Sequence, residues 1–313
     1  LSDGVNDEAF AAWAQARRLP PGLRAGRRTL KARLNRRYWR PLRTRVFEAG
    51  VWLIGQHAAG IAQARDVRVA PLFVPAQDLD PRLDGFTILH LSDLHLDSLS
   101  GVREAIVRAV DGLTPDLCVL TGDYAAHYRR NPEAVVAGLR EILAGVQSRH
   151  GIYLSLGNYD SAALAIALRA ESGCRLLVNE AASLTHDGAA ISLLGLDDPF
   201  ELAHGPMQEA LAADSDGFRI VLSHTPDLAA AASAAGHHLY LCGHTHGGQI
   251  CLPGGRALFA NTSRPDLVRG LWYEDGMWGY TTSGAGVSGI PRRHNCPPEV
   301  AVLTLVSGLE TGA

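Results

Sequence analysis

The chain has 313 residues, of which 47% are hydrophobic, and a formal net charge of −3. This length suits one large domain with an appendage or two small domains, and either arrangement can bury a core. Five cysteines, an odd number without CxxC spacing, indicate neither a disulfide framework nor a cysteine zinc site, and they favour a reducing compartment.

The charge is unevenly distributed along the chain. Residues 17–45 contain eleven Arg and one Lys without a single acidic residue, so the rest of the chain carries −15. Within this basic arm, apolar residues recur every four positions, which predicts an amphipathic helix interrupted at Pro41: Leu30, Leu34, Tyr38, Leu42 and Val46. We therefore predict a basic helical extension over residues 1–68 and a separate main domain over 69–313.

The arm has three interpretations. Clustered cations together with Tyr38, Trp39 and Trp52 favour attraction to an anionic membrane surface through residues 17–45. A helical embellishment packed on the domain and a contact with nucleic acid are the alternatives. We expect neither a transmembrane span nor a signal peptide, although residue 1 is Leu and a segment could precede it.

Strand and helix patterns alternate from residue 86 onward. Apolar runs predict strands at 86–92, 117–122, 151–158, 190–196, 218–224, 238–244 and 300–306, and amphipathic patterns predict helices at 101–113, 131–146 and 161–172. Asn131 and Pro132 form a helix start signal. This order predicts an α/β domain.

Side chains that can bind metal follow several of these strands. They are Asp93, His95, Asp123, Asn158, Asp160, His224, His244 and His246. Ligands bind beyond the carboxyl ends of strands in open α/β sheets, so we expect these groups to converge. Because side chains two residues apart in extended backbone point the same way, His244 and His246 should project together.

The residue types suggest two cations. Seven ligands that mix carboxylate, amide and imidazole are too many for one ion, and mixed N/O sites favour Mn, Fe, Zn or Co over calcium. Two cations can clamp the attacking and leaving oxygens of a displacement at phosphorus and lower the pKa of a bound water. The chain is therefore predicted to act on a phosphate ester or phosphoanhydride.

The motif series DxH, GD, GNxD, a lone His and GHTH resembles the calcineurin-like metallophosphoesterase superfamily over about residues 86–305. The stretches "GHTHGGQICLPGG" and "SGAGVSGIPRRHNCPPEVAVLTL" look like its small, membrane-associated bacterial branch. The resemblance implies a four-layer αββα sandwich of two central sheets. It also implies that Asp93, His95, Asp123 and His246 hold one metal, Mn²⁺ first among the candidates, and that Asp123, Asn158, His224 and His244 hold the other.

One position departs from the superfamily pattern. Where that pattern has GNHD, this chain has GNYD, with Tyr159 in the place of a His that assists the leaving oxygen. A phenol, with a reference pKa near 10, donates a hydrogen bond but is a poor acid at neutral pH, which favours a good leaving group. UDP-diacylglucosamine pyrophosphatases of the same superfamily also depart from His here, and the resemblance thus suggests a phosphoanhydride substrate. Asp160 should orient its neighbours.

Several other residues are weaker candidates. Substrate contact is considered for Tyr124 and His127 near the bridging carboxylate, and for Arg264, Arg269, Arg292, Arg293, His294 and Asn295 in the C-terminal loops, where guanidinium groups could hold phosphate. A solvated surface position is the alternative for each of these arginines. His90 is expected to be a hydrogen-bonded core residue, and Cys242 and Cys251 are expected to pack.

The sequence therefore predicts a dinuclear metal-dependent phosphohydrolase with a lipid- or nucleotide-linked diphosphate substrate such as UDP-diacylglucosamine. By the resemblance, it would be cytoplasmic and peripheral at a bacterial inner membrane, with an exported location as the alternative. A nuclease or cyclic-nucleotide phosphodiesterase, and a metal-bound interaction protein without catalysis, are the other hypotheses.

Overall fold

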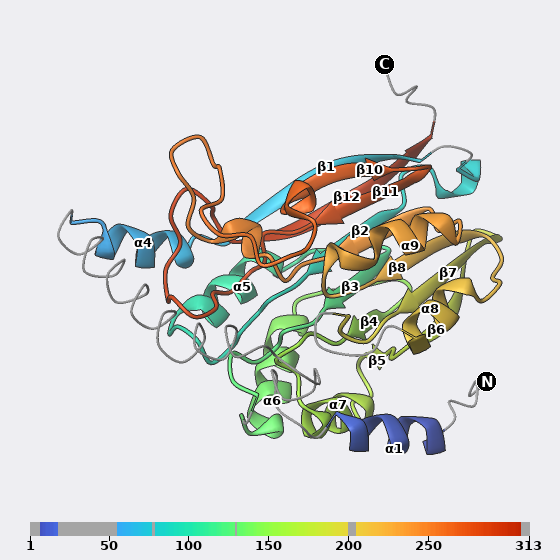
Figure 1. Cartoon of the computed structure of the whole chain (residues 1–313), viewed down its shortest axis with the longest axis horizontal. Helices are drawn as coiled ribbons and strands as arrows, with labels where there is room; N and C mark the ends of the chain where they lie inside the picture. The colour runs from blue at the N-terminus through green and yellow to red at the C-terminus, as the bar shows by residue number, and fades with distance from the viewer. Residues whose placement is uncertain (1–6, 18–54, 77–78, 129, 200–204, 308–313) are drawn as a thin grey trace.

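A computed structural model of the chain describes residues 7–17, 55–76, 79–128, 130–199 and 205–307 (Figure 1). Two six-stranded sheets form its centre. The first has the order β1 (Arg68–Ala76), β12 (Glu299–Ser307), β2 (Thr87–Leu91), β3 (Leu117–Thr121), β4 (Ile152–Ser155) and β5 (Arg175–Leu176). The second has the order β10 (Gly270–Glu274), β11 (Met277–Thr281), β9 (Leu239–Cys242), β8 (Phe218–Leu222), β7 (Ala189–Gly195) and β6 (Glu180–His186).

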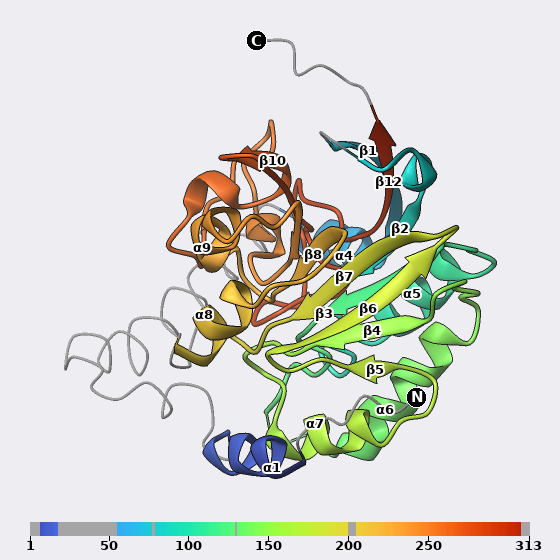
Figure 2. The same cartoon turned by 90° about the vertical axis from the view of Figure 1, so that its right-hand side faces the viewer.

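Helices cover the outer faces of both sheets (Figure 2). The first sheet packs against α5 (Val102–Val110), α6 (Pro132–Leu143) and α7 (Ala162–Arg169), whose apolar residues form one buried cluster with it. The second packs against α8 (Gly205–Ala212) and α9 (Ala229–Ala234). The chain thus forms the four-layer αββα sandwich that the resemblance implies.

The central strands are buried on both faces. In β2, Ile88 belongs to the core between the sheets, while Leu89 and Leu91 belong to the core under the helices. In β3, Val119 belongs to the core between the sheets and Leu120 to the core under the helices. Alternate residues therefore serve different cores, which explains why these strands are continuous hydrophobic runs. Because β2, β3 and β4 are parallel, their carboxyl ends lie at one edge of the sheet.

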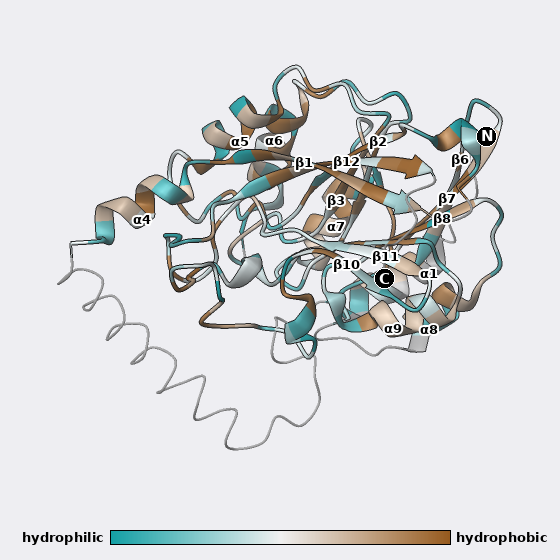
Figure 3. Cartoon of the chain, turned by 90° about the horizontal axis from the view of Figure 1, so that it is seen from above, coloured by the Kyte–Doolittle hydropathy of each residue, from teal (hydrophilic) through white to brown (hydrophobic). Residues whose placement is uncertain are grey.

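The predicted strands and helices after residue 86 are all present, but β1 was missed. Pro71 and Pro75 lie inside β1 and are unusual for a strand. They are tolerated because β1 is an edge strand that pairs only with β12. Hydropathy colouring shows apolar segments along both strands (Figure 3). The strands β5, β6, β10 and β11 and the helices α8 and α9 were also not predicted.

Two helices of the N-terminal region belong to the described structure. Helix α1 (Asp7–Ala16) packs against α7, with Phe10 and Trp13 on the apolar cluster of the first sheet. Helix α4 (His57–Ala64) precedes β1. The amphipathic pattern from Leu30 to Val46 lies outside the described residues. Among the helices that the structure does describe, none is both long and apolar enough to cross a bilayer.

Candidate metal centre

Six of the seven predicted metal ligands form two buried clusters at the carboxyl ends of the strands. One cluster contains Asp93, His95 and His246, and the other contains Asp123, His224 and His244. Within each cluster, one potential ligand atom from every residue lies within 4.8 Å of the others. These groups come from the ends of β2, β3, β8 and β9, so the expected convergence is present.

Asp123 lies between the two clusters. Its Oδ2 is 3.2 Å from Nε2 of His224 and 3.6 Å from Nε2 of His95. The imidazoles also face one another in pairs, with His224 Nε2 at 3.1 Å from His244 Nδ1 and His95 Nε2 at 3.2 Å from His246 Nε2. One carboxylate oxygen is thus adjacent to both groups of ring nitrogens.

The backbone at His244 and His246 is not extended, so the expectation that their side chains project together was wrong. Their φ angles are 69° and 52°, in the left-handed region, and their imidazoles enter different clusters. Positive φ also occurs at Asp93, His95 and Asp123. Such conformations are costly for residues other than Gly and concentrate at functional sites.

Asp160 joins the loops after β3 and β4. Its Oδ2 accepts hydrogen bonds from the backbone N–H groups of Asp123 and Gly157, both at 2.8 Å, and its Oδ1 accepts one from Tyr124 at 3.0 Å. The loops also approach closely, because a Cβ on Gly122 would lie 2.2 Å from the nitrogen of Gly157. Burial, reinforced by the charge of Asp123, raises the pKa of Asp160 to about 7. Through these hydrogen bonds Asp160 connects the backbone of the two loops.

Backbone carbonyls and one amide orient the imidazoles. Nδ1 of His224 is 2.7 Å from the carbonyl oxygen of Thr121, and Nδ1 of His95 is 3.1 Å from that of Ala125. Donation from Nδ1 to these carbonyls aims Nε2 at the clusters, where it can bind a cation once it is deprotonated, as in metal-binding histidines. Asn261 places its Nδ2 at 3.0 Å from Nε2 of His244. Sequence reasoning missed Asn261, because no motif marks a loop residue 17 positions after the histidine that it contacts.

The imidazoles differ in their proton affinities. Burial disfavours the charged form of His224, but the attraction of Asp123 outweighs it and raises the pKa of His224 to about 10. Burial and the neighbouring His224 lower the pKa of His244, while burial and His95 lower that of His246 well below its usual range. Burial likewise opposes the charged form of Asp123, but His224 outweighs it and lowers the pKa of this carboxyl.

The residues present fit a pair of divalent cations. Oδ1 of Asp93 and Oδ1 of Asn158 are buried, and within the described part of the chain neither accepts a hydrogen bond. Buried oxygens of this kind are costly unless a donor or a cation satisfies them. The four imidazoles, Asp93 and Asp123 of the two clusters form a mixed N/O donor set that suits borderline divalent metals, and Asn158 precedes Tyr159, whose N–H donates to Asp123.

Tyr159 lies beside the first cluster. Its side chain is partly exposed, and its ring meets the His95 ring edge to face at a centroid distance of 5.7 Å. Its backbone N–H donates to Oδ1 of Asp123 at 2.8 Å. The phenol is therefore next to the residues that would hold metal.

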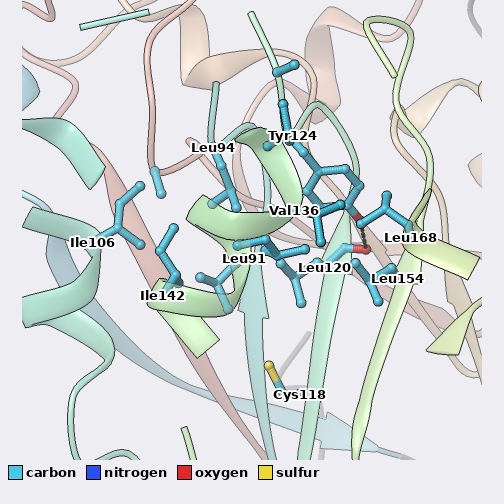
Figure 4. Packing of buried hydrophobic residues seen from close by; sticks show 14 of the residues in the cluster. Leu91, Leu94, Ile106, Cys118, Leu120, Tyr124, Val136, Ile142, Leu154 and Leu168 are labelled. Atoms are coloured by element: carbon cyan, nitrogen blue, oxygen red, sulfur yellow. Dashed lines mark hydrogen bonds between the residues drawn. The ribbon is translucent and has the colours of Figure 1, made fainter. Parts of the chain in front are cut away.

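Tyr124 is not at the mouth of the site, contrary to the hypothesis of substrate contact. It is fully buried in the core under the helices, among residues that include Leu94, Val136 and Leu168 (Figure 4). Its hydroxyl donates to the carbonyl oxygen of Ser155 at 2.7 Å. The aromatic side chain turns inward because its ring completes this apolar cluster.

The C-terminal arginines mostly have structural contacts. Arg293 is fully buried and donates to the carbonyl oxygens of Ser283 and Gly286, so it supports the loop behind His246 and does not present itself to substrate. Arg292 is also buried. Three of the remaining candidates are engaged within the protein: Arg264 pairs with Asp266 and Glu274, Arg269 donates to the oxygen of Gly255, and Asn295 donates to the oxygen of Cys251. The other two candidates are histidines. His294 is half-buried beside Gly60, and His127 is exposed.

His90 and the cysteines behave as expected. Nε2 of His90 is 2.9 Å from Oγ1 of Thr121 in the core, and burial lowers the pKa of His90 to about 3. Cys242 and Cys251 are buried thiols outside both clusters, and all five cysteines are unpaired.

Arg17 is part of the domain, although it was counted with the basic arm. It is fully buried, donates to the carbonyl oxygens of Gly157 and Asp160, and pairs with Asp197. Arg17 therefore cannot contact a membrane surface. Instead, it holds the loop that carries Asn158 and Tyr159.

Comparison with known proteins agrees with this geometry. The family model described as calcineurin-like phosphoesterase matches residues 86–248. The chain is 28% identical to the uncharacterized metallophosphoesterase YkoQ of Bacillus subtilis, over 75% of this chain and 89% of that protein. It is 30% identical to the phosphodiesterase YaeI of Escherichia coli, over 71% and 82%. It is 25% identical to the UDP-2,3-diacylglucosamine pyrophosphatase LpxG of Chlamydia trachomatis, over 71% and 84%.

Proposed function

Since the chain belongs to the calcineurin-like phosphoesterase family, and so is a metal-dependent hydrolase, we propose that it cleaves a phosphoanhydride or phosphodiester with two divalent cations. The position of Asp123 Oδ2 between the two clusters carries this proposal. Asp93, His95, Asp123 and His246 would hold one cation, and Asp123, Asn158, His224 and His244 would hold the other. Mn²⁺ is the first candidate, followed by Fe, Zn and Co.

Divalent cations bound there would supply positive charge against phosphoryl oxygens and acidify water for attack on phosphorus. The chain's own residues prepare the site. Thr121 and Ala125 fix the orientations of His224 and His95, and Asp160 holds the backbone of Asp123. The clusters are buried, so charges within them interact more strongly than they would in water.

The nature of Tyr159 supports a substrate with a good leaving group. The phenol is next to His95 and can donate a hydrogen bond to a phosphoryl or leaving oxygen. A phosphate or nucleoside monophosphate leaves with little protonation, whereas a simple alkoxide requires it. Similarity to LpxG supports a lipid- or nucleotide-linked diphosphate, such as UDP-diacylglucosamine, as the substrate.

The proposed place of action is an anionic membrane surface, peripheral to the cytoplasmic face of the inner membrane. The eleven cationic residues that remain in 18–45 after Arg17 is removed support this proposal, because each contributes about 1 kcal/mol near a negative surface. The proposed division at residue 68 is kept for the basic segment 18–45, because α1 and Arg17 pack within the phosphoesterase domain.

The test is hydrolysis of a matched pair of substrates by the metal-loaded protein. One is a nucleotide diphosphate with a lipid-like tail, and the other is a plain aryl phosphodiester. Preference for the anhydride is the expected result. Preference for the diester would favour a general phosphodiesterase or nuclease over a pyrophosphatase. Cleavage of neither substrate would refute the catalytic proposal.

Two substitutions connect activity to the site. Asp123→Ala should abolish turnover and reduce the metal content, because the shared carboxylate is lost; Asp66→Ala, which removes an exposed carboxylate, is the control. Normal activity with Asp123→Ala would contradict the assignment. Tyr159→His should selectively improve the cleavage of substrates with poor leaving groups, and an unchanged substrate profile would contradict the proposed role of the phenol.

A further inference from the structure

An apolar hairpin projects beside the metal centre. Residues 250–260, here called the site hairpin, pair through the N–H of Leu252 to the oxygen of Arg256 at 2.9 Å and the N–H of Leu258 to the oxygen of Ile250 at 3.1 Å. Its large apolar side chains face water: Leu252 is 40% exposed, Leu258 43% and Phe259 57%. Three such residues close together on one hairpin suggest an interaction surface.

The site hairpin is attached directly to the histidine turn. The sulfur of Cys251 lies 3.4 Å from the carbonyl oxygen of Gly247, and a Cβ on Gly248 would lie 2.4 Å from Cβ of Ala257. Asn261, immediately after the hairpin, contacts His244. A surface that receives this hairpin is therefore brought close to the metal centre.

The segments 55–64, 247–263 and 283–298 contain no acidic residue, and Asp227, from another segment, accepts hydrogen bonds from Thr262 and Ser263 just after the hairpin. These segments touch one another: Ile250 forms a β-bridge with His294, and the N–H of Arg293 donates to the oxygen of Gly60 in α4 at 2.9 Å. In the same region, α4 exposes Ala58 and Ala59. The chain outside the basic arm has a net charge of −15, so these three segments without acidic residues differ from the rest of it.

The basic arm is followed closely in sequence by α4. Its last cation, Arg45, is ten residues before Gly55, where the described chain resumes. Figure 1 shows α4 and the orange loop that follows β9 at one end of the fold. Exposed apolar side chains beside the exposed Arg256, on segments that contain no acidic residue, match the chemistry of an anionic lipid interface.

We propose that the site hairpin inserts Leu252, Leu258 and Phe259 into an anionic phospholipid bilayer, so that the metal centre faces the membrane surface. This inference rests on the proposed function at a membrane and specifies which part of the fold makes the contact. Arg256, exposed at the hairpin, pairs with lipid phosphate. The basic arm provides long-range attraction, and the hairpin provides insertion.

The test is co-sedimentation of the full chain with vesicles of phosphatidylglycerol and phosphatidylcholine. The double variant L258S/F259S should partition about tenfold more weakly, because two large apolar side chains no longer enter the bilayer. The control is I166S, which removes a side chain that is 53% exposed on α7, away from the hairpin. Hydrolysis of a water-soluble aryl phosphodiester should be unchanged in both variants.

Equal vesicle binding by L258S/F259S and the wild type would overturn the proposal, and so would an equal loss in I166S. Phe259→Trp provides a second measurement, in which brominated lipids should quench its added fluorescence; absence of extra quenching would also overturn insertion. If the wild type cleaves the soluble diester but does not bind vesicles, the membrane inference fails while the hydrolase assignment stands. If it binds vesicles but cleaves neither substrate, only the catalytic proposal fails.

Discussion

Replacing Arg17 with Met should destabilise the domain strongly, because it leaves Asp197 without its guanidinium partner. Both side chains are buried, with exposures of 0% and 2%. Breaking a buried ion pair from one side costs about 3–5 kcal/mol. Asp197 keeps hydrogen bonds from Trp13 and from the backbone of Asp198, so we take the lower end, about 3 kcal/mol. This corresponds to a roughly hundredfold smaller folding constant.

The assay is urea unfolding of the metal-free protein, which removes the contribution of metal binding to apparent stability. Arg68→Met is the matched control, because Arg68 pairs with Asp66 at the surface, where both side chains are more than half exposed. Such exposed pairs contribute about 0–1 kcal/mol. A double-mutant cycle of Arg17→Met with Asp197→Asn should show a large coupling energy.

Arg17 also holds the loop after β4, so its loss should affect catalysis separately from stability. Its Nε donates to the oxygen of Asp160 at 3.0 Å, and a second guanidinium nitrogen donates to Gly157. We expect kcat to fall in Arg17→Met at temperatures where the variant remains folded, with a smaller change in KM. If Arg17→Met is within 1 kcal/mol of Arg68→Met and retains wild-type kcat, the role assigned to this buried arginine is wrong.

Three further predictions follow from single contacts. The raised pKa of His224, about 10 in the metal-free protein, means that a bound cation displaces a proton, so the apparent Mn²⁺ affinity should rise about tenfold per unit between about pH 6 and 9. Calorimetry in buffers of different ionisation enthalpy should detect that proton. Asn261→Ala should weaken metal binding by about 10- to 100-fold, measured by titration, because His244 loses an orienting contact. Tyr124→Phe should lower the free energy of unfolding in urea by about 1 kcal/mol, because the hydrogen bond to Ser155 is lost, and it should leave kcat/KM unchanged. A large loss of activity would show that Tyr124 takes part in the site after all.

The sequence predicted which strand ends would converge, because that information is local. Each of the runs that end before Asp93, Asp123 and His224 is a short apolar strand, and parallel strands bring their carboxyl ends to one edge. Mixed ligand types then indicated two cations without any knowledge of distances. The family resemblance added the αββα architecture, which periodicity alone does not distinguish from other α/β folds.

Other features depend on contacts between distant segments and could not be read from the sequence. The direction of Tyr124 depends on the apolar space under α6 and α7. Arg17 is buried because it meets Gly157, Asp160 and Asp197, at least 140 residues away in the sequence. A run of arginines does not reveal which of its members is exposed to water and which is buried, so the burial of Arg17, the first of the run, could not be predicted. The outward or inward position of Arg293 similarly depends on the carbonyl oxygens that surround it.

The left-handed backbone of the cluster residues has a structural cause. Each loop at the site hydrogen bonds to a loop from another strand: the N–H of Asp93 donates to Gly122, that of His95 to Asp123, and that of His244 to Oδ2 of Asp93, at 2.9–3.0 Å. Positive φ costs about 1–2 kcal/mol per residue, so these interloop bonds must offset it. Four of the left-handed residues, Asp93, His95, Asp123 and His244, are therefore joined by these bonds into one interdependent unit. A chain that formed only one of the two sheets could not hold either cluster, because each cluster draws its side chains from strands of both sheets.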